Sequence, residues 1–237
     1  MSDHLPYYIY IVFLLTTLAT FAFLHFGFKS AEPKKSNVAL IISICLVVWL
    51  FIIGTLSLNA FFVDYETIPP KFVLAIMPPN LFVMLLFISR RSRNFIRQIP
   101  ITTLTYLHLV RVPVEIVLWW LALEHWLPML MTFEGSNYDI LSGITAPFVA
   151  IFMVGLRSKV KIGAIIWNFL ALGLLVTIVY HALFSTPFPF QKFAFDQPNI
   201  AVFYFPFIWL PAFIVPAVLF SHLAALYQLF SKSEESI

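Results

Sequence analysis

The chain has 237 residues, of which 61% are hydrophobic and 11% are charged. Soluble domains carry roughly 25% charged residues, so this composition excludes an ordinary soluble domain. Apolar segments of about 20 residues recur along nearly the whole chain, which predicts an all-α, polytopic integral membrane protein. The single cysteine, Cys45, excludes an intrachain disulfide and any CxxC metal or redox motif.

Seven apolar segments predict a bundle of seven transmembrane helices that form one transmembrane domain over residues 1–237. The expected spans are, in chain order, residues 5–28, 38–62, 70–89, 102–131, 140–156, 162–184 and 200–230. The last segment is longer than a bilayer requires, so we expect this helix to be tilted, bent or protruding.

Basic and acidic residues alternate from loop to loop. The first, third and fifth loops hold the basic residues Lys29, Lys34 and Lys35, then Arg90, Arg91, Arg93 and Arg97, then Arg157, Lys159 and Lys161. By the positive-inside rule these loops are cytoplasmic, which predicts a cell-membrane protein with an extracytoplasmic N-terminus and a cytoplasmic C-terminus. Topology therefore explains the formal charge of +3 and the pI of about 9.0, and we expect no nucleic-acid partner.

Prolines stand inside several of the expected helices. Pro78 and Pro79 fall near the middle of the third span, and Pro206, Pro211 and Pro216 lie in the seventh. An internal proline removes a backbone hydrogen bond and kinks the helix. Two interpretations follow: the kinks improve packing, or the third helix is broken and its exposed backbone lines a binding site.

The fourth span carries three polar residues, His108, Arg111 and Glu115, on one predicted helical face. Glu115 lies near the middle of the span, where a carboxylate surrounded by hydrocarbon is costly, so it should face a partner or a cavity. Arg111, one turn away, is the expected partner. The pair is either a structural ion pair that fixes the helix register or part of a ligand or proton site.

Other polar residues fall into two predicted depths. Asn168 and His222 belong to the inner half of the bundle with His108, Arg111 and Glu115, and Asn80 lies near mid-depth. An outer rim is expected from Glu124, His125, Asn137, Tyr138, Asp139 and His181. In this region Asn137 or Asp139 is also suited to cap the fifth helix.

Two cofactor hypotheses arise from the histidines. His125, His181 and Asp139 offer nitrogen and oxygen ligands for a divalent metal, but no HxxxH, HExxH or HxH motif is present, so the ligands would have to come from separate helices. Two histidine pairs, His108 with His222 and His125 with His181, would suit two haems stacked across the membrane.

The leading functional prediction is a buried polar pocket that binds a small-molecule or lipid-like ligand for transport or sensing. Glu115 would be its ionisable centre, Arg111 its partner and an anion contact, and Asn80, His108 and His222 its hydrogen-bonding groups. One alternative is an integral-membrane enzyme or redox protein that depends on a metal or haem. Another is a membrane anchor subunit of a larger complex or homo-oligomer. In each case the lipid bilayer is a partner.

Overall fold

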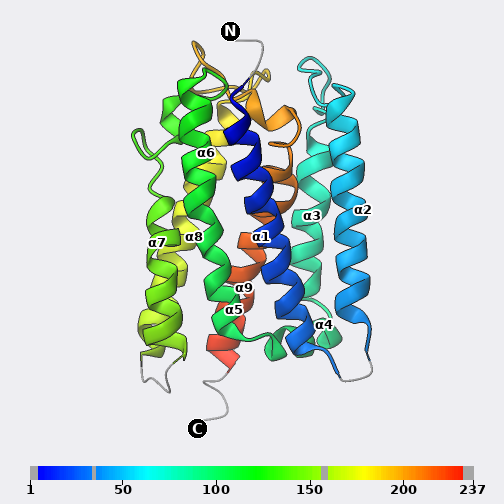
Figure 1. Cartoon of the computed structure of the whole chain (residues 1–237), viewed down its shortest axis with the longest axis vertical. Helices are drawn as coiled ribbons and strands as arrows, with labels where there is room; N and C mark the ends of the chain where they lie inside the picture. Colours follow the sequence, from blue (N-terminus) through cyan, green and yellow to red (C-terminus); the bar gives the residue numbers. More distant parts are fainter. Residues whose placement is uncertain (1–4, 34–35, 156–159, 232–237) are drawn as a thin grey trace.

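The computed structural model describes residues 5–33, 36–155 and 160–231, and these form an all-α bundle (Figure 1). Within these described residues, five helical segments are long and apolar enough to cross a membrane: α1 (Tyr7–Ala31), α2 (Val38–Leu58), Ile101–Leu123, α8 (Lys161–Phe184) and Leu210–Ser231. The number becomes six if the bent pair α3 (Val73–Leu86) and α4 (Arg90–Gln98) forms one span. The chain is therefore a multi-pass membrane protein.

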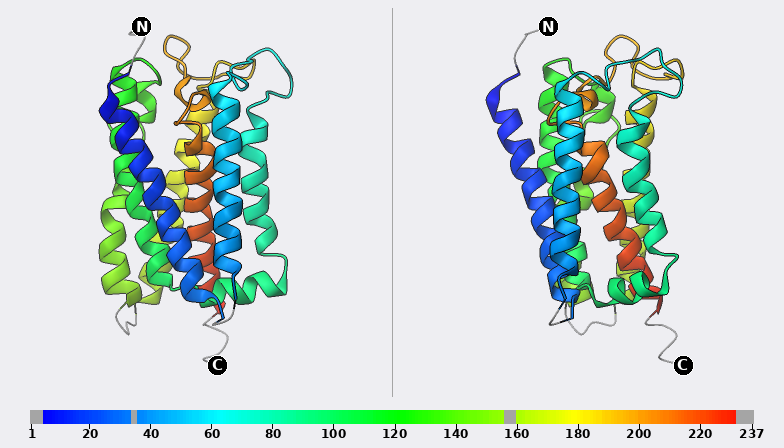
Figure 2. Two further views of the ribbon diagram at one scale, coloured as in Figure 1. Left: turned by 45° about the vertical axis from the view of Figure 1, so that its right-hand side comes forward. Right: turned by 90° about the vertical axis from the view of Figure 1, so that its right-hand side faces the viewer.

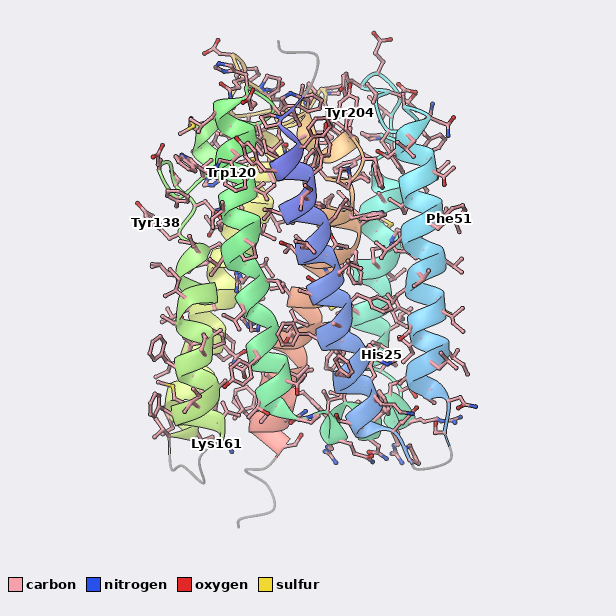
Figure 3. All side chains as sticks on the ribbon, viewed as in Figure 1. His25, Phe51, Trp120, Tyr138, Lys161 and Tyr204 are labelled. Atoms are coloured by element: carbon pink, nitrogen blue, oxygen red, sulfur yellow. The ribbon has the colours of Figure 1, made fainter. Side chains whose placement is uncertain are left out.

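The outer surface of the bundle has the polarity expected for contact with lipid. On α2, the exposed side chains include Leu40, Ile44, Val47 and Phe51, and Phe51 is 72% exposed and points away from the bundle (Figure 3). Soluble proteins rarely expose a continuous apolar surface of this kind. In a bilayer, hydrocarbon surrounds this apolar surface, which then avoids the free-energy cost of exposure to water.

The third span is a continuous helix across its two prolines. Pro78 and Pro79 lie inside α3, and the Asn80 side chain donates a hydrogen bond to the Ile76 carbonyl at 2.8 Å. Of the two interpretations, the one in which the third helix is broken at these prolines is wrong. The break comes after Leu86 instead, where the chain turns by 88° into α4.

The segment expected to be the third loop is largely helical. α4 lies across the end of the bundle where α9 also ends (Figures 1 and 2). Its Ile96 is buried, and Gln228 of α9 donates hydrogen bonds to the Ile96 and Ile99 carbonyls, each at 2.8 Å. Arg90, Arg91 and Arg97 stay exposed, so α4 has one apolar and one basic side.

The seventh predicted span begins later than expected and is irregular at its start. A short helix η4 (Ala201–Phe203) is followed by turns, a π-helical segment η5 (Leu210–Ile214) and α9 (Val215–Ser231). Pro216 has no N–H to give to the carbonyl four residues before it, that of Ala212. The indole Nε1 of Trp49 on α2 donates to this carbonyl at 2.9 Å.

Trp49→Phe should therefore destabilise the protein by about 1–3 kcal/mol, because it leaves a carbonyl at membrane depth without this donor. Unfolding in detergent with increasing sodium dodecyl sulfate measures the change. In a Pro216→Ala background, which supplies a new N–H, the same substitution should cost clearly less. An equal cost in both backgrounds would contradict the assignment.

Candidate functional site

The centre of the bundle holds a buried ion pair between Arg111 and Asp139. Arg111 starts α6 (Arg111–Leu123), which continues α5 (Ile101–Leu107) and the short 3₁₀ turn η1 (His108–Val110). Its Nε donates to Asp139 Oδ2 at 2.6 Å and its Nη2 donates to Asp139 Oδ1. The contact is a two-pronged ion pair, the strong form of arginine–carboxylate pairing, and Arg111 is only 2% exposed.

Two further groups hold the guanidinium of Arg111. Its Nη2 also donates to the Ala171 carbonyl at 3.0 Å, and its Nη1 lies 3.1 Å from Nε2 of His222. The other ring nitrogen of His222, Nδ1, lies 3.0 Å from Oδ1 of Asn168, while the Asn168 amide donates to the Ala164 carbonyl. Because Asn168 Oδ1 can only accept and Arg111 can only donate, His222 is the neutral tautomer with its proton on Nδ1.

Glu115, one turn further along α6, has a different partner. Asn137 Nδ2 donates to both carboxylate oxygens of Glu115, at 2.7 and 2.6 Å, and to the Met131 carbonyl at 3.1 Å. The Oδ1 of Asn137 accepts from the backbone N–H of Asp139 at 3.0 Å. Asn137 therefore connects the two carboxylates of the cluster.

This arrangement corrects two predictions. Arg111 pairs with Asp139 rather than with Glu115, and Asn137 and Asp139 belong to the buried cluster rather than to an outer rim. Asp139 occupies the N-cap position of α7 (Ile140–Phe148) but its side chain makes no cap hydrogen bond, whereas Asn137 Oδ1 accepts the backbone N–H of Asp139 at the start of this helix.

The physical reason lies in the connection between α6 and α7. The helix α6 ends at Leu123, well before the predicted Met131, because His125 adopts a left-handed conformation (φ 62°) and Trp126 N–H bonds to the Leu121 carbonyl. The chain then folds back down the flank of the bundle, and α7 begins well below the top of α6 (Figure 1). Asp139 thus lies at the depth of Arg111.

A glycine allows α7 to approach this closely. A Cβ at Gly143 would lie 2.7 Å from Val112 Cγ2, 3.0 Å from the Val112 nitrogen and 3.2 Å from the His108 carbonyl oxygen. After α7 the helix continues as the π-helical segment η3 (Val149–Gly155), which follows Pro147. The predicted last residue of this span, 156, lies outside the described residues.

His108 lies beside the cluster without joining its hydrogen bonds. Its ring packs on that of His222 with centroids 4.0 Å apart, and Trp167 packs against both rings. Neither ring nitrogen of His108 has a hydrogen-bond partner among the described residues. Rings in direct contact leave no room for a porphyrin between them, so this pair does not fit a bis-histidine haem.

The remaining predicted outer residues do not assemble into a site. His125 Nδ1 lies 3.1 Å from Gln197 Oε1, and His181 packs against Phe193. Tyr138 is 56% exposed on the outer flank of the bundle (Figure 3), and Glu124 follows the end of α6.

The proposed metal ligands are likewise separated. His125 Nδ1 contacts Gln197, and Asp139 is committed to Arg111. Across residues 5–33, 36–155 and 160–231, no group of three or more His, Cys, Asp or Glu side chains is placed to hold a metal ion.

A cavity of about 360 Å³ extends from the charged cluster toward the end of α8 that lies opposite α4. Its volume lies at the small end of the roughly 300–1,000 Å³ range of ligand pockets. Arg111, Glu115 and Asp139 line one part, Asn80 contributes from α3, and Thr186 and Asn199 line the part beyond α8. Most of the wall is apolar and comes from α6, α8 and the start of α9.

The predicted inner residues divide into those that line the cavity and those that do not. Arg111, Glu115 and Asn80 line it, whereas His108, Asn168 and His222 are buried behind Arg111. Sequence reasoning missed Asp139, Thr186 and Asn199 as lining residues. One signal for Asp139 was available: the predicted fifth span is short for a bilayer crossing, so the residues at its start lie within the membrane rather than at its surface.

The bundle, its buried ionic cluster and the adjoining cavity define a multi-pass α-helical membrane protein with an internal polar site. The chain belongs to the family described as a domain of unknown function (DUF8737), whose model matches residues 68–230. This match contains every residue of the cluster and of the cavity wall. No curated protein and no solved structure matches the chain.

Proposed function

We propose that the cavity binds an amphipathic small molecule or lipid-like ligand and that the protein transports or senses it. The observation that carries this proposal is the position of the cluster: Arg111, Glu115 and Asp139 are buried among transmembrane helices and also line the cavity. A ligand that fills the apolar part would place its polar end against these three side chains.

Energetics favour a functional over a purely structural role for the cluster. Replacing a buried ion pair by well-packed apolar residues is often neutral or stabilising, so such a pair is weak support for stability alone. Glu115 adds a further ionisable group whose burial costs free energy. Ionisable residues inside membrane helices commonly mark ligand or ion pathways.

The wall of the cavity offers a route from the bilayer. Val176 and Val179 of α8 line the cavity and are 59% and 38% exposed. Both lie well inside α8, at a depth where the surroundings are hydrocarbon. An apolar tail would therefore enter sideways from the membrane.

Seven crossings are part of this proposal, with the segment from Ile140 to Gly155 as the fifth. An odd number agrees with the start of α1 and the end of α9 at opposite ends of the bundle (Figure 2). The α9 end also carries Lys161 and the arginines of α4, which supports a cytoplasmic C-terminus by the positive-inside rule (Figures 1 and 3). Lys34, Lys35, Arg157 and Lys159 lie outside the described residues.

The ligand proposal is tested by extraction of the purified protein. We expect the wild-type protein to carry a co-purifying amphipathic compound, identified by mass spectrometry after solvent extraction. Glu115→Gln should lower its amount because the amide removes the charge at the polar end. Ala182→Phe, a substitution in the partly exposed cavity wall, should lower it by filling space.

Glu66→Gln is the matched control, since Glu66 lies in the exposed connection between α2 and α3. Thermal unfolding of each variant checks that the fold is retained. Identical extracts from wild type and from well-folded Glu115→Gln and Ala182→Phe proteins would refute the ligand proposal.

A further inference from the structure

With Glu115 ionised, the charges that face the cavity do not balance. Among the described residues of its wall, Arg111, Glu115 and Asp139 are the ionisable ones. The pair between Arg111 and Asp139 is neutral as a unit. An ionised Glu115 adds one negative charge without a cation of its own, because its hydrogen-bond donor is the neutral amide of Asn137.

Arg111 has little capacity left for an anionic ligand. Its guanidinium has five N–H groups. One is on Nε and two are on Nη2, and these donate to Asp139 and to the Ala171 carbonyl, while Nη1 donates to His222. An anion would therefore meet one remaining N–H together with two carboxylates, and the sum of these charges repels it.

Glu115, in contrast, has hydrogen-bonding capacity left for a ligand. A carboxylate offers about four lone-pair positions. Both carboxylate oxygens of Glu115 accept hydrogen bonds from the same nitrogen, Asn137 Nδ2, which also donates to the Met131 carbonyl. The carboxylate is thus held in place by one nitrogen and keeps acceptor positions for a donor in the cavity that it lines.

From this charge and hydrogen-bond balance we propose that the ligand is an amphipathic organic cation, a hydrophobic amine whose ammonium group binds Glu115. This inference rests on the proposed function and names the ligand class of the same site. The ammonium group supplies the missing positive charge and three N–H donors. The alkyl tail lies along Leu118, Leu175, Ile178, Ile214 and Val218 and reaches the bilayer beside Val176 and Val179.

The test compares decylamine, decanol and decanoate, three probes with the same tail and different head groups. Binding to the protein in nanodiscs is measured by isothermal titration calorimetry, with empty nanodiscs subtracted to remove partitioning into lipid. We expect the wild-type protein to bind decylamine at least about tenfold more tightly than decanol or decanoate, the scale of one charge-assisted hydrogen bond. Glu115→Gln should remove this preference and leave decanol binding unchanged, and Glu66→Gln should retain it.

The outcomes separate this inference from the proposed function. Equal binding of the three probes, or tighter binding of decanoate, would overturn the proposal that the ligand is an amine. If Ala182→Phe also weakens that binding, the cavity is retained as a ligand site. An amine preference that persists in Glu115→Gln would also overturn the role of Glu115. Absence of saturable binding of all three probes would overturn both proposals.

Discussion

Asp139→Leu should destabilise the protein by about 3–5 kcal/mol, the largest loss that we expect from a single polar substitution. Removal of Asp139 leaves the Arg111 guanidinium buried with two of its N–H groups unpaired and its charge uncompensated. Unfolding in mixed micelles with increasing sodium dodecyl sulfate measures the loss. Arg111→Met should be similarly costly, since it leaves a buried carboxylate.

The double substitution Arg111→Met with Asp139→Leu is the control for this prediction. With both charges replaced by apolar groups, the protein should regain most of the stability that either single substitution loses, because replacement of a whole buried pair is often neutral. Additive losses in the double variant would show that the two side chains do not act as a pair.

Gly143→Val should destabilise the protein by more than about 3 kcal/mol. One added methyl group in a packed core already costs about 1–3 kcal/mol, and here its neighbours include the Val112 nitrogen and the His108 carbonyl, which are backbone atoms that cannot rotate away. The displaced α7 would also pull Asp139 from Arg111. The same unfolding assay measures the effect.

Gly173→Val is the matched control. A Cβ at Gly173 on α8 meets no atom within 4 Å, so this substitution should change stability little. Equal losses at Gly143 and Gly173 would mean that helix propensity, rather than the close approach of α7, sets the cost.

Much of the fold is predictable from the sequence because hydrophobic length determines which segments cross a bilayer. Apolar composition predicts the segments that become α1, α2, α8 and α9, although their ends depend on local turns. The end of α6 shows the difficulty: after Glu124 and His125 the sequence is apolar again from Trp126 to Met131, and the left-handed residue that stops the helix is His125 rather than a glycine.

The sequence predicts which residues belong to the site better than it predicts which of them form hydrogen bonds and ion pairs with one another. The cost of burying charge marks Arg111 and Glu115 in the sequence, and both are buried in the cavity wall. The partner of Arg111 depends on where the connection after α6 folds back, which is a tertiary effect. An ideal helical period also cannot anticipate the 3₁₀ turn at His108–Val110, just before Arg111.

Photoaffinity labelling tests most directly whether the cavity is a ligand site. A decylamine analogue with a diazirine in its tail, added to the protein in nanodiscs and then irradiated, should label peptides of α8 and α9 that line the cavity. An excess of decylamine should suppress that labelling and leave background labelling of the lipid-facing surface of α2 unchanged. Labelling confined to outer surfaces, or labelling of α8 and α9 that decylamine does not suppress, would contradict a ligand site in the cavity.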